Sequence, residues 1–397
     1  MKYIVIVPDG AADYPIDILE GRTPLEVAET PFIDNLAKNG ILGRVKTVPE
    51  NFTPSSDVAN LSLLGYEPQK YYFGRGPLEA ANLGIDLEEN DLAFRCNLIT
   101  EAEGKIIDYS AGHITDKEAK ILIEELNKNL ATENIKFFAG KSYRHLLIYK
   151  DGAKLELDKL RYFAPHDIMN RQIKDYLPSG KSSQIVVELM LRSKEILSKH
   201  QINQVRVDLG ENPANMIWLW GCGSKPAIPT FKERFGLDGA IISAVDLING
   251  IGRLIGFEII KVEGANAYYD TNYKGKAQAA LEALERVDFV FVHIEATDEA
   301  GHNQDLRMKI TCIERIDKFV VGTILEGLKN KDYRILIAPD HATPISKRTH
   351  TNEPVPFVIF GKNIKKGNFS HFCEAEALSS DLFFESGTEL LKYFLSV

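Results

Sequence analysis

The stretch VDFVFVHIEATDEAGH, residues 287–302, joins an apolar run to a group of acidic and histidine side chains. Its first half is rich in β-branched and aromatic residues, a composition typical of a buried strand. The same pattern recurs in five other runs, at residues 2–7, 239–243, 257–260, 333–338 and 356–360. Nearly continuous apolar runs indicate strands that are covered on both faces, as in a parallel sheet.

Helical patterns separate these runs, at residues 244–254, 274–284 and 306–328. Strands that alternate with helices predict an α/β fold with a doubly wound, mostly parallel sheet. The middle of the chain is different, because short strand-like pieces at 92–99, 135–138 and 145–149 accompany helices at 116–129 and 182–199. We therefore expect a first domain built from residues 1–70 and 206–397, interrupted by an inserted α+β domain at 71–205.

The composition limits the class of protein. A chain of 397 residues can form one large domain or two, and its 26% charged residues are ordinary for a globular protein. The net charge of −9 argues against a nucleic-acid-binding surface, although a local basic cluster could still bind a small anionic substrate.

The cysteines and apolar segments predict a cytoplasmic location. None of the cysteines has the spacing of a zinc or redox motif, which favours reduced thiols at Cys96, Cys222, Cys312 and Cys373. The first apolar run is too short for a signal peptide. No run approaches the roughly 20 residues of a membrane helix, so we expect no membrane partner.

Residues that commonly bind metals stand beside the ends of the predicted strands; they are Asp9, Asp298, His302, Asp340, His341 and His350. Ligands in open α/β sheets gather outside the carboxyl ends of the strands, so these acids should meet at one edge. Carboxylate oxygen and imidazole nitrogen suit Mn²⁺, Zn²⁺ or Mg²⁺. Each motif alone is as easily a turn or a helix cap, but together they indicate a metal site.

A pair of serines precedes a short helical pattern in SSDVANLSLLGY, residues 55–66. Ser55 or Ser56 could simply cap the helix. Alternatively, a helix N-terminus with a nearby metal would favour the deprotonated form of a serine and make it a nucleophile. Both roles are compatible if Ser55 lies at the cap and Ser56 reacts. Two metal ions beside Ser56 would suit phosphoryl transfer.

The chain resembles the cofactor-independent phosphoglycerate mutases of the archaeal type, in the alkaline phosphatase superfamily. The resemblance runs almost end to end, through PDGAAD, SSDVANLSLLGY, GRGPLEAANLGI, SAGHIT, SYRHLL, EATDEAGHNQD and PDHATP. It implies two divalent ions, with Mn²⁺ preferred and Mg²⁺, Zn²⁺ or Co²⁺ suitable. One ion would be held by Asp9, Ser56, Asp340 and His341, and the other by Asp298, His302 and His350. Archaeal-type sequences often have Gly where this chain has Ser55.

The resemblance also implies an activity, the interconversion of 3-phosphoglycerate and 2-phosphoglycerate without 2,3-bisphosphoglycerate. This isomerase step of glycolysis and gluconeogenesis would pass through a phosphoserine at Ser56. The inserted domain would be a cap that excludes water and binds the small anionic, phosphorylated substrate. The resemblance favours His113 and Arg144 as catalytic residues, among a wider set of candidates that also includes Arg75, His145, His166 and, in the first domain, Arg253.

Other activities are compatible with the same motifs. A homoserine kinase-like phosphotransferase is the first alternative, because NPANMIWLW at residues 212–220 resembles a bacterial branch with that proposed activity. A metal-dependent phosphomonoesterase is the second, since relatives on this fold hydrolyse esters. A binding protein that has kept the fold without catalysis is the third. The sequence carries no signal for an oligomeric state.

Overall fold

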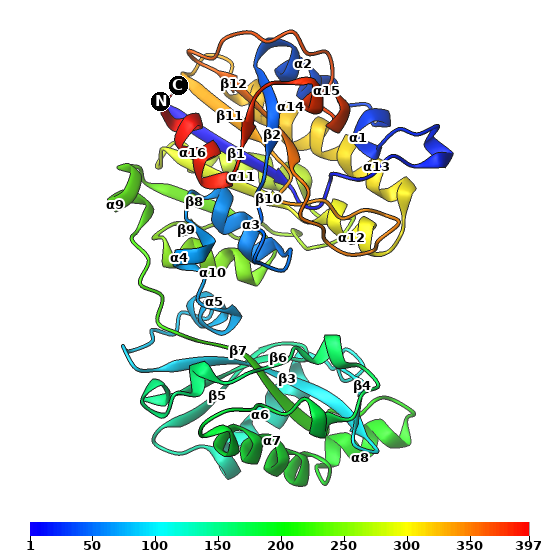
Figure 1. Ribbon diagram of the computed structural model, residues 1–397, viewed down its shortest axis with the longest axis vertical. Helices are drawn as coiled ribbons and strands as arrows, with labels where there is room; N and C mark the ends of the chain where they lie inside the picture. Colours follow the sequence, from blue (N-terminus) through cyan, green and yellow to red (C-terminus); the bar gives the residue numbers. More distant parts are fainter. Residues whose placement is uncertain (397) are drawn as a thin grey trace. The chain divides into compact units, whose positions relative to one another are not determined.

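The computed structural model describes residues 1–396. The chain forms two compact units, the first from residues 1–72 with 228–396 and the second from Phe73–Ala227. Figure 1 follows the chain through both units and labels their helices and strands.

The first unit is built on a twisted sheet. Among the described residues its spatial order is β13 (Phe383–Phe384), β2 (Ile41–Val45), β12 (Val355–Gly361), β11 (Tyr333–Ile337), β1 (Lys2–Pro8), β10 (Phe289–Ile294), β8 (Gly239–Ile242) and β9 (Glu258–Ile259). The five strands from β11 to β9 are parallel, and β12 runs antiparallel to both β11 and β2. The carboxyl ends of β11, β1 and β10 therefore share one edge.

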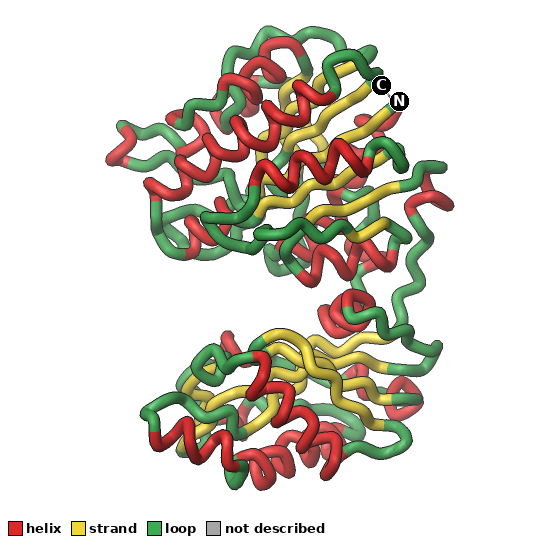
Figure 2. Tube along the Cα trace, turned by 180° about the vertical axis from the view of Figure 1, so that it is seen from behind, coloured by secondary structure: helices red, strands yellow, loops and turns green. Residues whose placement is uncertain are grey.

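Helices cover both faces of this sheet, as Figure 2 shows from behind. One face packs in a large apolar core against α2 (Pro31–Asn39), α11 (Tyr273–Ala283), α13 (Leu306–Arg315), a π-helical segment (Ile316–Val321), α14 (Gly322–Gly327) and α15 (Glu374–Ser379). The other helices of the unit are α1 (Pro24–Val27), α3 (Ser56–Leu63), α4 (Pro68–Tyr71), α9 (Phe231–Phe235), α10 (Asp246–Leu254), α12 (Ala296–His302) and α16 (Gly387–Ser396). On the opposite face Gly252 of α10 approaches Ile241 of β8, and Phe394 of α16 packs on Tyr3 of β1.

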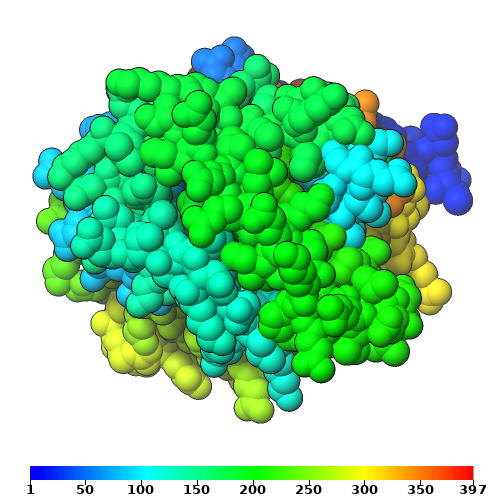
Figure 3. All heavy atoms as spheres, turned by 90° about the horizontal axis from the view of Figure 1, so that it is seen from below, coloured from blue at the N-terminus to red at the C-terminus, as the bar shows by residue number. Residues whose placement is uncertain are grey.

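The second unit is an antiparallel sheet with helices. It contains β4 (Lys105–Asp108), β3 (Leu92–Ala102), β6 (Arg144–Tyr149) and β5 (Ile135–Lys141), and β7 (Met216–Ser224) pairs with β3. Its main core joins one face of the sheet to α6 (Asp116–Leu130) and α7 (Ser183–Leu197), and α8 (Gln201–Asp208) follows. On the other face α5 (Arg75–Asn82) covers Ala93, Leu146 and Ile148. Figure 3 shows a face of this unit whose middle is formed by green atoms, the colour range that includes α7 and α8.

The predicted fold class, a mostly parallel α/β sheet with an inserted α+β domain, is confirmed. The structure nevertheless groups residues 206–227 with the second unit, whereas the sequence analysis assigned them to the first. The physical reason is β7, whose residues from Met216 to Ser224 pair along the length of β3. The predicted helix at 306–328 is observed as three consecutive segments, α13, a π-helical turn at Ile316–Val321, and α14.

Candidate metal and nucleophile site

The loops that follow three neighbouring strands carry the acidic candidates. β1 pairs with β10 through Pro8 and Ile294 and with β11 through Ile6 and Ile337, so the three strands end side by side. Asp9 follows β1, Asp340 follows β11, and Asp298 lies in α12 directly after β10. The edge at which the sequence analysis expected these acids to meet is therefore where the structure brings them together.

The first ligand cluster contains Asp9, Asp340 and His341, whose ligand atoms all lie within 4.8 Å of one another. The Nε2 atom of His341 is 3.5 Å from Oδ1 of Asp9 and 3.5 Å from Oδ2 of Asp340. All three side chains are at most 4% exposed. Asp340 is fixed through Oδ1, which accepts from the backbone N–H groups of Gly10 at 3.1 Å and His341 at 3.0 Å.

The second ligand cluster contains Asp298, His302 and His350. Asp298 Oδ2 is 3.1 Å from His302 Nε2, and Asp298 Oδ1 is 3.4 Å from His350 Nε2. The two histidine Nε2 atoms are 2.9 Å apart. The His341 ring stacks on His350 with centroids 4.0 Å apart, so the two clusters adjoin, and His341 also groups with Asp298 and His350.

The contacts at Nδ1 indicate that each of the three imidazoles, in its neutral form, presents its Nε2 lone pair to the clusters. His302 Nδ1 donates to the carbonyl of Arg348 at 3.0 Å, and His350 Nδ1 donates to that of Pro54 at 3.3 Å. His341 Nδ1 lies 3.3 Å from Thr343 Oγ1, a hydroxyl that itself donates to Asp298 Oδ1. Carbonyl oxygens only accept, so the first two contacts assign a proton to Nδ1. The Thr343 hydroxyl already donates to Asp298, so it accepts from His341, whose Nδ1 also carries a proton. Outer hydrogen bonds of this kind are typical of metal-binding histidines.

The donor atoms fit divalent cations. Asp9 Oδ1 is buried and has no hydrogen-bond partner among the described residues. Lone pairs of carboxylate and imidazole that converge at such short distances repel one another unless a cation lies between them. Mixed oxygen and nitrogen donors of this type suit Mn²⁺, Zn²⁺ or Mg²⁺.

The pKa values of the cluster reflect the same crowding. Burial, together with the charge of Asp340, raises the pKa of Asp9 well above its ordinary value. Burial lowers the pKa of His341 to about 4. The hydrogen bond to Asp298 raises the pKa of His302 to about 9. Opposite shifts in neighbouring groups are typical of a site that binds charge.

Ser56 is the first residue of α3 and lies beside the clusters. Its Oγ is 3.2 Å from His341 Nε2, a distance at which the hydroxyl donates to the ring nitrogen. Asn60, one turn further along α3, donates from Nδ2 to the Ser56 carbonyl and to Asp340 Oδ2, both at 2.8 Å. Ser55 occupies the N-cap position, but its side chain makes no capping hydrogen bond. Asn60 and Thr343 are contacts that the sequence analysis missed.

In the second unit, two of the sequence candidates surround one tyrosine. The His113 ring packs on Tyr143 with centroids 6.2 Å apart, and the Arg144 guanidinium lies 5.5 Å from the centre of the same ring. His113 has φ of +50° and follows Ala111 and Gly112, which also have positive φ. Three consecutive residues with positive φ make this loop a tight turn of uncommon backbone conformation.

A second basic and aromatic group surrounds Trp220 of β7. The guanidinium groups of Arg75 and Arg95 lie 5.6 and 4.7 Å from its ring, and the His166 ring lies 5.4 Å away. Tyr109 packs on both His166 and Tyr143, so it joins this group to the one around Tyr143. The sequence analysis missed Arg95, although a charged residue inside the apolar strand LAFRCNLI was a visible signal.

Two weaker candidates do not join these groups. His145 is buried in β6, where its Nδ1 accepts from the Gly140 N–H, and burial lowers its pKa to about 3. It therefore stays neutral and cannot serve as a cationic ligand for an anion. Arg253 is exposed on α10 of the first unit.

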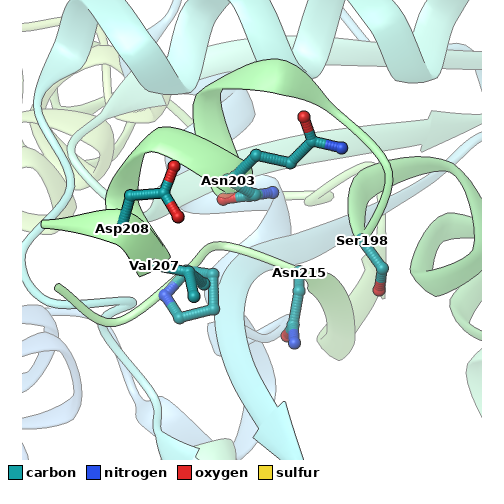
Figure 4. Close-up of a pocket in the computed structure, with 7 residues that line it drawn as sticks. Ser198, Asn203, Val207, Asp208 and Asn215 are labelled. Atoms are coloured by element: carbon teal, nitrogen blue, oxygen red, sulfur yellow. The ribbon is translucent and has the colours of Figure 1, made fainter. Parts of the chain in front are cut away.

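A surface pocket of about 310 Å³ in the second unit lies beside α8 (Figure 4). Its lining includes Asn203, whose amide bonds the carbonyls of Leu197 and Ala214 and so serves the local fold. None of the candidate residues lines this pocket. Over residues 1–396, no helix has the length and apolar character needed to cross a bilayer.

Comparisons with known proteins identify the family of the chain. Residues 37–203 match the family model of 2,3-bisphosphoglycerate-independent phosphoglycerate mutases. A protein of Methanosarcina mazei with that name is 50% identical over 91% of this chain and 90% of its own length. A solved structure of the PH0037 protein from Pyrococcus horikoshii has a TM-score of 0.85 at 31% identity, covering 99% of this chain and 96% of that one.

A second solved structure, the cofactor-independent phosphoglycerate mutase of Thermoplasma acidophilum, has a TM-score of 0.69 at 28% identity and covers both chains completely. The identity and coverage of the Methanosarcina relative are high enough to settle the family. This chain belongs to the 2,3-bisphosphoglycerate-independent phosphoglycerate mutase family.

Proposed function

We propose that this protein interconverts 3-phosphoglycerate and 2-phosphoglycerate without 2,3-bisphosphoglycerate, through a phosphoserine at Ser56. The observation that carries the proposal is the position of Ser56 Oγ, 3.2 Å from His341 Nε2 at the edge of the ligand clusters, in a chain of this family. The reaction makes the protein an isomerase that acts on a small phosphorylated substrate.

Two divalent ions, with Mn²⁺ preferred, complete the site in this proposal. Asp9, Asp340, His341 and Ser56 would hold one ion, and Asp298, His302 and His350 the other. The convergent, unpartnered donor atoms support this assignment. Bound ions of this kind lower the pKa of a serine hydroxyl and neutralise charge on a phosphoryl group.

Ser56 is the nucleophile in the first transfer. A bond forms between its Oγ and phosphorus as the bond from phosphorus to the O3 oxygen of the substrate breaks, and O3 gains the proton that Ser56 loses. The second transfer reverses these steps at the O2 oxygen, so that Ser56 regains a proton. The N-terminal N–H groups of α3 support the negative charge of the phosphoserine. Asn60 holds the first turn of α3 through the Ser56 carbonyl.

The second unit binds and retains the glycerate in this proposal. Arg144 binds the carboxylate, for which a planar guanidinium is well suited. His113 moves protons at the glycerate hydroxyls, because an imidazole can both donate and accept a proton. Arg75 and Arg95 place guanidinium groups beside Trp220, although Glu79 pairs with Arg95 at 3.0 Å, and His166, whose pKa is lowered by burial, adds an imidazole to the same group. Retention of the glycerate and exclusion of water are what separate a mutase from a phosphatase.

The test is an assay of the Mn²⁺-loaded protein with 3-phosphoglycerate and no 2,3-bisphosphoglycerate, in H₂¹⁸O. We expect 2-phosphoglycerate whose phosphoryl group carries no ¹⁸O, and we expect a chelator to abolish its formation. Release of ¹⁸O-labelled phosphate instead would identify a phosphomonoesterase. No reaction here, with transfer from ATP to homoserine, would identify the kinase-like alternative.

A further inference from the structure

A buried lysine lies behind the first ligand cluster, in the otherwise apolar interface between α11 and β10. Lys276 is fully buried, and its Nζ is 2.7 Å from Glu295 Oε2 and 2.8 Å from the His293 carbonyl. An ammonium group in this position costs several kcal/mol unless it is paired and hydrogen-bonded. The two partners therefore fix the position of the ammonium group and, through it, that of Glu295.

The other oxygen of Glu295 holds a histidine. Oε1 accepts from the Ala244 N–H at 2.8 Å and from the Ser243 hydroxyl at 3.0 Å, and lies 3.2 Å from Nδ1 of His293. His293 is itself fully buried in β10. With its Nδ1 side held by a fixed carboxylate, the imidazole has one orientation available.

The far side of this imidazole contacts the cluster. His293 Nε2 is 3.3 Å from Oδ2 of Asp9, and 3.9 Å from Oδ2 of Asp340. The other oxygen of Asp9, Oδ1, has no hydrogen-bond partner among the described residues and lies 3.5 Å from His341 Nε2. The two oxygens of Asp9 thus face different surroundings, Oδ2 toward His293 and Oδ1 toward the cluster.

We propose that Lys276, Glu295 and His293 form a positioning column that selects Oδ1 of Asp9 as the metal ligand. The inference rests on the proposed function, because it concerns the ion held by Asp9, Asp340 and His341. Because both ring nitrogens of His293 face carboxylate oxygens, both donate, and the bond from Nε2 to Oδ2 keeps the Asp9 carboxylate from rotating or binding through both oxygens. None of the three residues touches the substrate, so they are positioning residues, not catalytic ones.

A purely structural role for the column would have different consequences. Loss of one buried charged group whose partners remain destabilises a protein, wherever that group lies. Arg334 provides a matched control, because it is also buried and bonds the carbonyls of Lys362, Phe394 and Leu395 near the opposite end of β11 from Asp340. Arg334→Met should lower the free energy of unfolding and leave metal binding unchanged.

The test is a calorimetric titration of the chelator-treated full chain with Mn²⁺. In His293→Ala we expect one class of ion to bind about 10- to 100-fold more weakly, the usual effect of losing an outer hydrogen bond, and the other class to bind as in the wild type. His293→Gln, whose amide can still donate to Asp9 Oδ2, should recover part of the affinity. Raising the Mn²⁺ concentration should restore much of the turnover of His293→Ala.

A double variant guards against misfolding of the histidine variants. Lys276→Met with Glu295→Gln removes both charges at once and leaves no unpaired buried ion, and we expect the same selective loss of affinity. Wild-type affinity in His293→Ala and in the double variant would overturn the inference and leave the proposed function standing. An equal loss of affinity in Arg334→Met would also overturn it. A wild-type chain that binds no Mn²⁺ would overturn the proposed metal site and the inference together.

Discussion

The functional groups of the two units are built in opposite ways. In the first unit, carboxylates and imidazoles are buried or half-buried at strand ends, and Asp9 Oδ1 has no donor to satisfy it among the described residues. In the second, guanidinium and imidazole groups lie against the rings of Tyr143 and Trp220, and His113 is exposed. Metal binding by buried side chains depends on the positions of individual ligand atoms. Anion binding beside aromatic rings depends instead on positive charge that several residues supply together. Substitutions in the first unit should therefore have abrupt effects on turnover, and those in the second graded effects on binding.

Ser56→Ala should have the largest effect on turnover. Removal of a nucleophile abolishes the covalent route, and we expect a loss of about 10⁴-fold or more in kcat. Ser55→Ala is the matched control, because Ser55 is adjacent and its side chain makes no capping hydrogen bond. We expect turnover to remain within about threefold of the wild type, because the buried Ser55 side chain neither caps α3 nor belongs to the ligand clusters.

Both variants should be compared by turnover and by trapping of ³²P from labelled 3-phosphoglycerate on the protein. Label on Ser55→Ala and none on Ser56→Ala is the expected pattern. The reverse pattern would assign the nucleophile to Ser55 and contradict the proposed mechanism.

Gly10→Ala tests how strictly the first unit depends on position. Gly10 has φ of +62°, and an added Cβ would lie 2.5 Å from Thr343 Oγ1 and 2.7 Å from Asp298 Oδ1. Because a displacement of about 1 Å at a reacting centre can cost 10²-fold, we expect a loss of that order in kcat/KM, with weaker Mn²⁺ binding. Gly21→Ala is the control, since Gly21 has φ of +79° with no heavy atom within 4 Å of the added Cβ. If both variants lost turnover to the same extent, backbone strain alone would explain the loss, and the crowded contact at Gly10 would not.

The same contrast explains what the sequence could predict. Asp9, Asp298 and Asp340 were predictable because each directly follows an apolar strand, and parallel strands share one carboxyl edge. The contact between Arg95 and Trp220 was not predictable, because it arises only through the pairing of β3 with β7, more than a hundred residues apart in the chain. That long-range pairing carries no local signal in either strand, and it also moves residues 206–227 into the second unit.

Arg144→Ala should have a graded effect on binding. We expect KM for 3-phosphoglycerate to rise about 10- to 100-fold, the range for loss of a hydrogen bond to a charged group, with a smaller change in kcat. Arg161→Ala is the matched control, because Arg161 is exposed in the same unit and its guanidinium lies 4.7 Å from the Phe163 ring centre, outside both basic groups. Steady-state kinetics at saturating Mn²⁺ separate KM from kcat. A fall in kcat as steep as that of Ser56→Ala would contradict the graded role of the second unit.

Glu374→Gln should have the smallest effect on turnover and a measurable one on stability. Glu374 is a half-buried acid of the first unit that accepts from the Asp13 N–H and the Thr23 hydroxyl, outside the ligand clusters. Burial raises its pKa from 4.5 to about 7. Between these pH values the folded chain keeps a proton that the unfolded chain has released, so the free energy of unfolding falls as pH rises through this window and is constant above it.

The size of this fall in the free energy of unfolding measures how much the burial of an ionised Glu374 costs the folded first unit. A pKa change of this extent corresponds to a decline on the order of 3 kcal/mol, and Glu374→Gln should lack it, because glutamine does not ionise. Urea unfolding of both proteins at pH 5, 6, 7 and 8 measures the difference, in which the other titrating groups cancel. Parallel curves at every pH would mean that Glu374 titrates normally, and that the Asp13 and Thr23 donors together compensate fully for the burial of its charge.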